Sequence, residues 1–273
     1  MAIPEGLSIT KILEKKAAAS LQIETLGSFE VTLNGNKIPD SAWKRDTAVQ
    51  LFQFFITSRN TRAMHKASII DRIWGETNEK AGNRNFKAAL HQLTKTIEPD
   101  KINREDQHFI IRQGLTYRLD TSQIWMDIDA LDDLIIIGNQ SMNDQPEEAI
   151  VAYQQAVDLY RGIYLPNRIY EDWCADERER IQVLVLGAMM SLAKLQLSRN
   201  PKETIRLAIR ALQIDPTWEE AYRLQMEAYL SEGNRPLAVK TYRKCQQILK
   251  QEFEIDPLPE TKRLFDKVVE AGS

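Results

Sequence analysis

The sequence predicts a mainly helical protein with a small β component, divided into two domains. Its 273 residues exceed the roughly 150 of one ordinary domain. With 43% hydrophobic and 27% charged residues, the composition is close to the globular average and excludes a disordered chain. Only 11 glycines and 10 prolines are present, too few for an all-β protein with many tight turns.

Basic charge is concentrated in one segment of the chain. Residues 41–119 contain 14 Lys and Arg against 8 Asp and Glu, a net charge of +6, whereas the whole chain carries −3. A basic segment inside an acidic chain is typical of a nucleic-acid reader joined to another domain.

Several other classes of protein are excluded. No apolar run approaches the roughly 20 residues of a membrane span, and the N-terminus lacks a secretion signal, so we expect a cytoplasmic protein without a membrane partner. Cys174 and Cys245 lie far apart and have no metal-ligand spacing, which predicts two buried thiols and no metal. The chain has three histidines, all in or beside the basic segment, and no phosphate-cradling glycine loop. We therefore expect no enzyme, no catalytic residue and no cofactor.

Two short alternating runs begin the first folded part of the chain. Residues 1–20 form an extension, a short helix or a disordered arm, to which we assign no function. Leu21 and Ile23 alternate with polar residues, as do the apolar residues around Val31, and Asn34-Gly35 follows. Because Asn-Gly tolerates the positive φ of a tight turn, a small antiparallel sheet is predicted.

Three helices are predicted between Ala42 and Ile97. The second ends at Gly75, which suits a left-handed cap. The third, from about Asn83 to Ile97, has an apolar stripe at helical spacing. This stripe consists of Phe86, Ala89, Leu90, Leu93 and Ile97. The opposite stripe is basic and polar, and includes Gln92.

A hairpin over residues 109–119, turning near Gln113-Gly114, completes a winged-helix order of sheet, three helices and hairpin. In this arrangement the third helix has the width of the major groove, where Arg, Lys and Asn reach base edges. The predicted DNA-binding residues of this helix are Asn83, Arg84, Lys87, His91 and Lys95. Arg112 and Arg118 of the hairpin would lie along phosphates or in a minor groove, and Lys44 and Arg45 at a helix start would hold phosphate.

The second half of the chain shows a helical-hairpin repeat. Tyr229, Gly233, Ala238 and Tyr242 have the spacing at which a tetratricopeptide helix pair packs an aromatic, turns and packs again. Asn200 marks a similar turn about 33 residues upstream. Tandem helical hairpins form curved surfaces for other proteins.

Several stretches carry a resemblance to a known family. They are residues 26–31, 69–75, 125–129, 160–166, 170–173, 177–180 and 215–221. The N-terminal part resembles the winged helix of OmpR-type response regulators, and the rest resembles the bacterial transcriptional activator domain of the SARP family, the Streptomyces antibiotic regulatory proteins. The resemblance covers roughly residues 21–268. It assigns residues 21–122 to the winged helix and 123–273 to the TPR-like activator domain.

The resemblance implies an activator that binds double-stranded DNA at promoter direct repeats as paired copies and helps RNA polymerase to engage. One departure concerns the third helix, where Leu93 is followed by Thr94 instead of the Arg common in the family. This departure and the overall acidity leave an alternative open, a TPR-type protein–protein adaptor whose winged helix no longer reads DNA.

Overall fold

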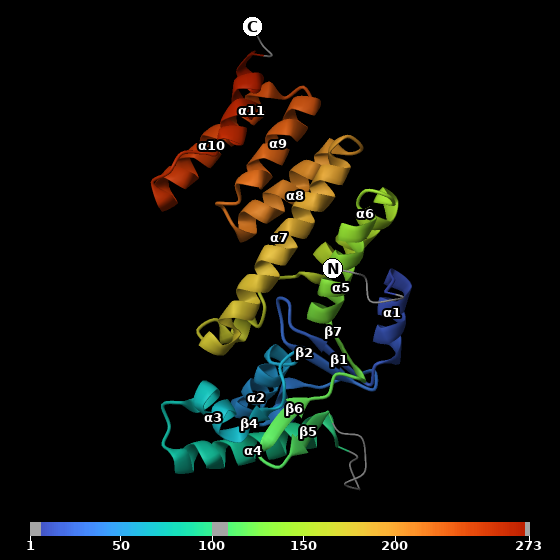
Figure 1. Cartoon of the computed structure of the whole chain (residues 1–273), viewed down its shortest axis with the longest axis vertical. Helices are drawn as coiled ribbons and strands as arrows, with labels where there is room; N and C mark the ends of the chain where they lie inside the picture. Colours follow the sequence, from blue (N-terminus) through green and yellow to red (C-terminus); the bar gives the residue numbers. More distant parts are fainter. Residues whose placement is uncertain (1–6, 100–108, 271–273) are drawn as a thin grey trace. The chain divides into compact units, whose positions relative to one another are not determined.

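The computed structural model describes residues 7–99 and 109–270 and is mainly helical with two small sheets, as the sequence predicts (Figure 1). The chain forms two compact units. The mixed unit comprises Thr10–Ala130 and Tyr160–Ile181, and the helical unit comprises the described residues up to Ile9, Leu131–Leu159 and the described residues from Gln182 onward. Compact units and domains are different divisions of a chain, so the domain limits 1–20, 21–122 and 123–273 stay a prediction.

The first sheet of the mixed unit has four strands in the order β3-β2-β1-β7. The strands are β1 (Leu21–Glu24), β2 (Glu30–Leu33), β3 (Asn36–Lys37) and β7 (Ile124–Met126). The predicted Asn-Gly turn joins β2 to β3, with φ of 48° at Asn34 and 78° at Gly35. Strand β7 pairs in parallel with β1, a pairing that we did not predict because its three apolar residues show no alternation.

The three predicted helices follow the first sheet. A 3-10 turn η1 (Asp40–Trp43) leads into α2 (Asp46–Thr57), then α3 (Lys66–Trp74) and α4 (Glu79–Ile97). Gly75 ends α3, but its φ of −56° is right-handed, so the prediction of a left-handed cap is wrong. The chain leaves α3 instead through a turn in which the backbone N–H and the hydroxyl of Thr77 both donate to the Trp74 carbonyl, at 2.9 and 2.8 Å.

The second sheet contains the predicted hairpin. Its strands are β4 (Met64–His65), β6 (Thr116–Leu119) and β5 (Ile110–Gln113), in the order β4-β6-β5. The turn between β5 and β6 contains Gly114 with φ of 62°. Strand β4 was not predicted, since two residues are too few for a periodic pattern.

Two further segments complete the mixed unit. Helix α1 (Ile9–Ala18) takes up the extension, where Ile12 is buried and the Lys16 ammonium lies 4.2 Å from the centre of the Trp125 ring. Residues Tyr160–Ile181 contain η2 (Pro166–Arg168), η3 (Asp172–Cys174) and the first turns of α7 (Ala175–Leu197).

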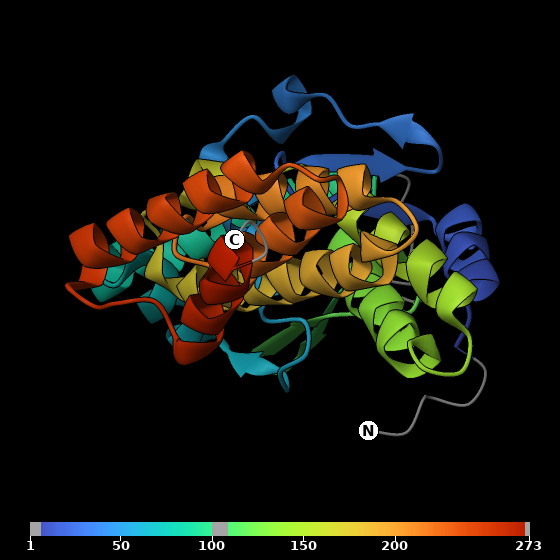
Figure 2. The same ribbon diagram turned by 90° about the horizontal axis from the view of Figure 1, so that it is seen from above.

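The helical unit is built from consecutive helical hairpins. It contains most of α5 (Asp127–Ser141) and α7, with α6 (Pro146–Leu159), α8 (Pro201–Ile214), α9 (Glu219–Ser231), α10 (Arg235–Phe253) and α11 (Pro259–Glu270). Helices α8, α9 and α10 lie side by side (Figures 1 and 2). The predicted turn at Gly233 joins α9 to α10 with φ of 70°, and Tyr242 stacks on Phe265 with ring centres 3.9 Å apart.

No helix within the described ranges is both long and apolar enough to cross a membrane.

Candidate nucleic-acid interface

Helix α4 carries most of the predicted DNA-binding residues, and its start is fixed by an N-cap. The Asn78 side-chain oxygen accepts a hydrogen bond from the Ala81 backbone N–H at 2.9 Å, which satisfies a donor that the helix leaves unpaired. The helix therefore begins at Glu79, one turn before the predicted Asn83. The signal was present in the sequence, because Asn is among the strongest N-cap residues.

The apolar stripe of α4 faces the interior of the mixed unit. Phe86, Ala89, Leu93 and Ile97 are buried, whereas Leu90 is half-buried. The Phe86 ring meets Tyr117 of β6 edge to face, with ring centres 5.0 Å apart. By this face the helix packs on α2 and, through Phe86, on the second sheet, which leaves the other face for solvent.

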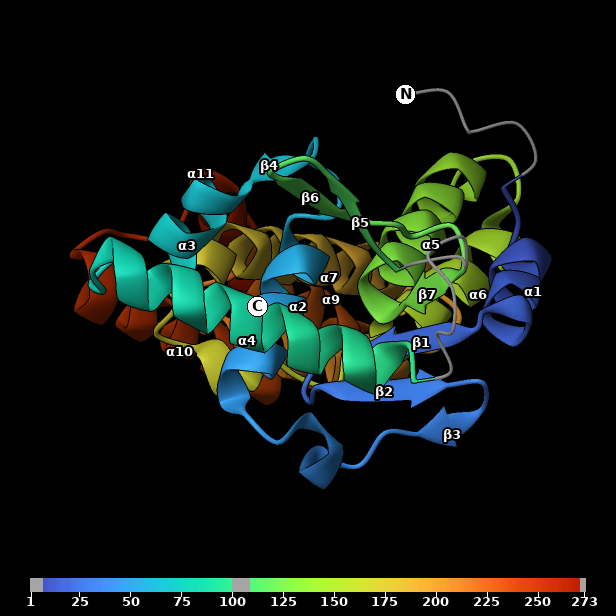
Figure 3. The ribbon, with the colours of Figure 1, turned by 90° about the horizontal axis from the view of Figure 1, so that it is seen from below.

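The opposite face of α4 is a row of exposed cations. Arg84, Lys87, His91 and Lys95 are all exposed, and their spacing of three and four residues places them on one stripe. Lys80, one turn earlier, extends the row and was missing from the prediction because the helix was expected to start later. None of these five side chains has an ion-pair partner among the described residues. We call this row the α4 cationic stripe; α4 lies nearest the viewer in Figure 3.

Polar residues beside the stripe are engaged within the fold. The Asn83 amide donates to the Glu79 carbonyl at 2.9 Å, and the residue is half-buried. The Gln92 amide donates to the Ala42 carbonyl at 3.1 Å and so joins α4 to η1. The Thr94 hydroxyl donates to the Leu90 carbonyl at 3.0 Å. Gln92 and Thr94 therefore serve the helix and its packing, while the Asn83 side-chain oxygen has no partner among the described residues.

The two hairpin arginines lie on opposite faces of the second sheet. Arg112 pairs across the strands with Tyr117, so the two share a face, and the Arg112 guanidinium lies 5.7 Å from the Tyr117 ring centre. Arg118 follows Tyr117 directly and therefore projects from the other face. Both arginines are exposed. Only Arg112 shares the sheet face that packs on α4, through Tyr117 and Phe86.

Lys66 is a further cation near this contact that sequence reasoning missed. It begins α3, and its ammonium lies 5.6 Å from the centre of the Phe86 ring. Phe86 thus has Lys66 over its ring and Tyr117 at its edge, and Tyr117 in turn has Arg112 over its ring. Two cations accordingly lie beside the wing and α4, placed by aromatic rings that are themselves buried.

Lys44 and Arg45 occupy the junction between η1 and α2. Both are exposed, and Arg45 is the N-cap residue of α2 but makes no side-chain capping bond. Lys44 has a positive φ of 56°, uncommon for a residue with a side chain. The following Asp46 carries opposite charge, yet both its carboxylate oxygens accept hydrogen bonds from the Arg168 guanidinium. Arg168 therefore neutralises the acidic charge beside these two cations.

The segment that carries Arg168 is bound to α2 by a polar network. The Arg168 Nε donates to Gln53 at 2.8 Å, and the side chain is 9% exposed. Farther along α2, the Tyr164 and Thr57 hydroxyls lie 2.8 Å apart. Phe54 meets the Trp173 ring edge to face at 5.7 Å. Residues more than 100 positions apart thus set the position of α2.

Two buried charged groups, Arg59 and Asp127, join segments of the mixed unit that lie far apart in the sequence. Arg59 donates to Asp129 at 2.6 Å and to Glu177 at 2.9 Å, and the Arg59 side chain is 1% exposed. Asp127 accepts hydrogen bonds from both the N–H and the hydroxyl of Thr25, at 2.6 and 2.7 Å. Burial raises the pKa of Asp127 to about 6, although its hydrogen bonds act in the opposite direction.

Four aspartates lie in the first turns of α5, directly after β7: Asp127, Asp129, Asp132 and Asp133. Asp127 and Asp129 have partners within the fold, so they act as structural acceptors and not as ligands. Within residues 7–99 and 109–270 no group of three His, Cys, Asp or Glu side chains could hold a metal ion. Cys174 and Cys245 are both buried, and each remains a free thiol.

Comparison with known proteins identifies one family and one similar fold. The family model described as bacterial transcriptional activator domain matches residues 126–269. No curated protein matches the chain. The solved structure of Mycobacterium tuberculosis EmbR in complex with low affinity phosphopeptide is similar, with a TM-score of 0.78, 16% identity, and coverage of 93% of this chain and 66% of that one. The chain thus spans just under two thirds of that protein, and a likeness at this identity shows the fold.

A second solved structure is less similar. The C-terminal TPR-containing domain of a Plasmodium falciparum FK506-binding protein has a TM-score of 0.40 and 18% identity, with coverage of 53% of this chain and 89% of that one.

Proposed function

Because the chain belongs to the family of proteins with a bacterial transcriptional activator domain, we propose that it is a sequence-specific transcriptional activator that binds double-stranded DNA. The observation that carries this proposal is the α4 cationic stripe. Its side chains are exposed and without ion-pair partners among the described residues, on a helix whose other face is fixed in a core. Such a helix can enter a major groove without unfolding or breaking existing contacts.

The proposed contacts divide into base readers and phosphate binders. Asn83, Arg84, Lys87, His91 and Lys95 would face the base edges of the major groove. The phosphate binders would be Arg112 and Arg118 in the wing, and Lys44 and Arg45 at the start of α2. Lys66 and Lys80 join this second set on the grounds of their position.

The finer features follow from the resemblance to SARP activators. We propose that paired copies of the protein bind direct repeats upstream of a promoter, associate with each other there, and engage RNA polymerase. This activity would place the protein in the bacterial cytoplasm. The TPR-like helices would supply a surface for the protein contacts.

Selection of bound sequences from fragmented genomic DNA tests both the binding and the arrangement of sites. We expect enrichment of a repeated motif whose two copies lie about 10 base pairs or a multiple apart, since the copies must face the same side of the duplex. Failure to enrich any motif, together with stable copurification of protein partners, would favour the adaptor and reject the DNA reader.

Variants at single positions test the docking of α4. We expect Arg84→Ala to lower the preference for the selected motif by roughly 1–3 kcal/mol, because a base contact is lost. Lys202→Ala, an exposed lysine on α8, is the matched control and should bind like the parent protein. If Arg84→Ala prefers the selected motif as strongly as Lys202→Ala does, α4 is not part of the interface.

A further inference from the structure

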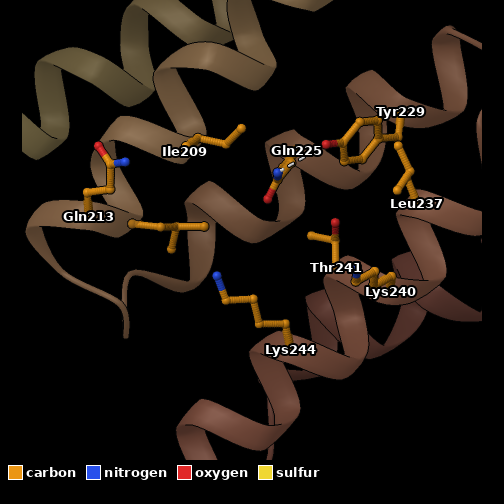
Figure 4. Close-up of a pocket in the computed structure, with 9 residues that line it drawn as sticks. Ile209, Gln213, Gln225, Tyr229, Leu237, Lys240, Thr241 and Lys244 are labelled. Carbon is orange, nitrogen blue, oxygen red and sulfur yellow. Dashed lines mark hydrogen bonds between the residues drawn. The ribbon is translucent and has the colours of Figure 1, made fainter.

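We propose that the pocket over α8, α9 and α10 binds an extended acidic peptide segment of a partner protein. The pocket has a volume of about 310 Å³ and lies wholly within the helical unit. It is a surface separate from the DNA interface of the mixed unit, so the inference goes beyond the proposed DNA binding. The lining residues are Ile209, Leu212, Gln213, Gln225, Tyr229, Leu237, Lys240, Thr241 and Lys244 (Figure 4).

Unused hydrogen-bonding groups inside the pocket indicate a ligand. Thr241 is 7% exposed, and its hydroxyl makes no hydrogen bond to another described residue but is open to solvent. Gln225 is 9% exposed, and its side chain makes one hydrogen bond to the described residues, a long one of 3.5 Å to the Tyr229 hydroxyl. Both groups are open to solvent in the pocket, and a peptide can replace the water there with hydrogen bonds of its own. An amide and a hydroxyl in this state suit the N–H and C=O groups of an extended peptide.

The positive charge of the pocket indicates an acidic partner. Lys240 and Lys244 are exposed, and neither has an ion-pair partner among the described residues. Helix α10 as a whole has five basic residues against one acidic residue, Glu252. Figure 4 shows Lys244 extending toward the side of the pocket that Ile209 and Gln213 line. Carboxylates are therefore the complementary groups.

The spacing of the two lysines indicates which acidic peptides fit. Residues four apart on a helix have Cβ atoms about 6 Å apart. In an extended peptide, alternate side chains point the same way and lie about 7 Å apart. A peptide with two acidic residues separated by one other residue can thus place one carboxylate at each ammonium. The side chain between them points away, so its identity matters less.

Apolar side chains favour a peptide over a nucleic acid. Ile209, Leu212 and Leu237 line the pocket, and Ile209 is 42% exposed. Aliphatic groups can be covered by an apolar residue next to the acidic pair, whereas a phosphate backbone offers no such group. The combination of two ammonium groups with an aliphatic lining matches a mixed acidic and apolar segment.

The experiment uses the full chain and fluorescently labelled synthetic peptides, with binding followed by anisotropy. One peptide contains Glu-Ala-Glu next to Leu, its isomer contains the same residues with the two Glu adjacent, and a third has Lys in place of Glu. We expect the alternating peptide to bind tightest and the Lys peptide not to bind. Equal binding of all three, or none by the alternating peptide, overturns the proposal.

Variants then assign the binding to the pocket. K240A/K244A should weaken the alternating peptide at least about tenfold, since two charge-assisted contacts are lost. K202A/K267A removes two exposed lysines outside the pocket and should leave the affinity unchanged. Equal effects of the two double variants would mean unspecific attraction and would overturn the proposal.

Thr241→Val separates a ligand contact from a structural role. Val has nearly the same shape, and the hydroxyl that it removes has no partner among the described residues, so urea unfolding should show stability unchanged or raised. We expect the same variant to weaken the alternating peptide about threefold or more. Unchanged peptide affinity would place the hydroxyl outside the contact and contradict the hydrogen-bonding part of the proposal.

DNA binding is measured in parallel, which keeps this inference distinct from the proposed function. K240A/K244A should retain the selected DNA motif, and Arg84→Ala should retain the peptide. Loss of DNA affinity in K240A/K244A without any peptide binding would assign the pocket to nucleic acid and overturn the peptide proposal.

Discussion

Arg168 neutralises Asp46, a residue 122 positions earlier in the chain, through two hydrogen bonds from its guanidinium to the carboxylate. The contact joins the segment around η2 to the first turn of α2. Asp46 directly follows Lys44 and Arg45, which we propose as phosphate binders. The pair therefore connects the stability of the mixed unit with the charge that the start of α2 presents to solvent.

A double-mutant cycle measures the strength of this contact. We expect Arg168→Met to lower the free energy of unfolding by about 2 kcal/mol, because Asp46 and Gln53 both lose a charged donor. Asp46→Asn should be milder, since Asp46 is 70% exposed and an amide oxygen still accepts. Urea unfolding of both single variants and the double variant gives the coupling. Strictly additive losses would contradict a direct interaction.

The positions of the hairpin arginines predict unequal effects on DNA binding. Arg112 lies on the sheet face that contains Tyr117 and packs on α4, whereas Arg118 projects from the other face. We therefore expect Arg112→Ala to weaken DNA of any sequence and to reduce the slope of log affinity against log salt by about one. Arg118→Ala should change both quantities less. Titrations at several salt concentrations measure the affinity and its salt dependence. A larger effect of Arg118→Ala would mean that the opposite face of the hairpin contacts the DNA.

Most of the α4 stripe could be predicted from the sequence, because the period of an amphipathic helix separates Phe86 and Leu93 from Arg84 and Lys87. The faces of Arg112 and Arg118 could also have been found, by counting strand alternation from Tyr117. The role of Gln92 could not, since its partner is a backbone carbonyl 50 positions away. Strand β7 and the Arg168 contact likewise depend on pairings more than 100 residues apart, for which no local pattern exists.

Burial of Asp127 predicts a specific pH dependence of stability. Its pKa is raised to about 6 in the folded chain, above the value of about 3.9 in an unfolded chain. Between these values the folded state binds more protons, so this group's contribution to stability is full below pH 4 and is lost as the pH rises through 6. Urea unfolding from pH 4 to 7, compared with Asp127→Asn, isolates this contribution. The slope should be absent in the variant, and an identical slope would assign the effect to another group.

At pH 7, where Asp127 is ionised, the same variant should also be less stable than the parent protein. Asp127 accepts from Thr25, Leu26 and Ile128 through its two oxygens. An Asn side chain has one acceptor oxygen and would turn an NH₂ group toward some of these donors. Asp127→Leu, which removes the acceptor altogether, should be less stable still, whereas equal stability of the parent and Asn forms would mean that the donors find other partners.

Gly27 tests how closely the segment around Arg161 is packed on the first sheet. Its φ is 90°, and a Cβ at this position would lie 2.8 Å from the Arg161 carbonyl carbon and 2.9 Å from the Gly162 nitrogen. Both neighbours are backbone atoms, so relief requires the two chain segments to separate. Gly27→Ala should therefore lower the free energy of unfolding by about 2–4 kcal/mol, through strain at positive φ and through overpacking.

Gly35→Ala is the matched control, because Gly35 also has positive φ, 78°, but nothing within 4 Å of the added Cβ. It should lose only about 1 kcal/mol, the strain alone. Both losses can be measured by urea unfolding at one pH, and equal losses would show that the contact between Gly27 and residues 161–162 opens without resistance.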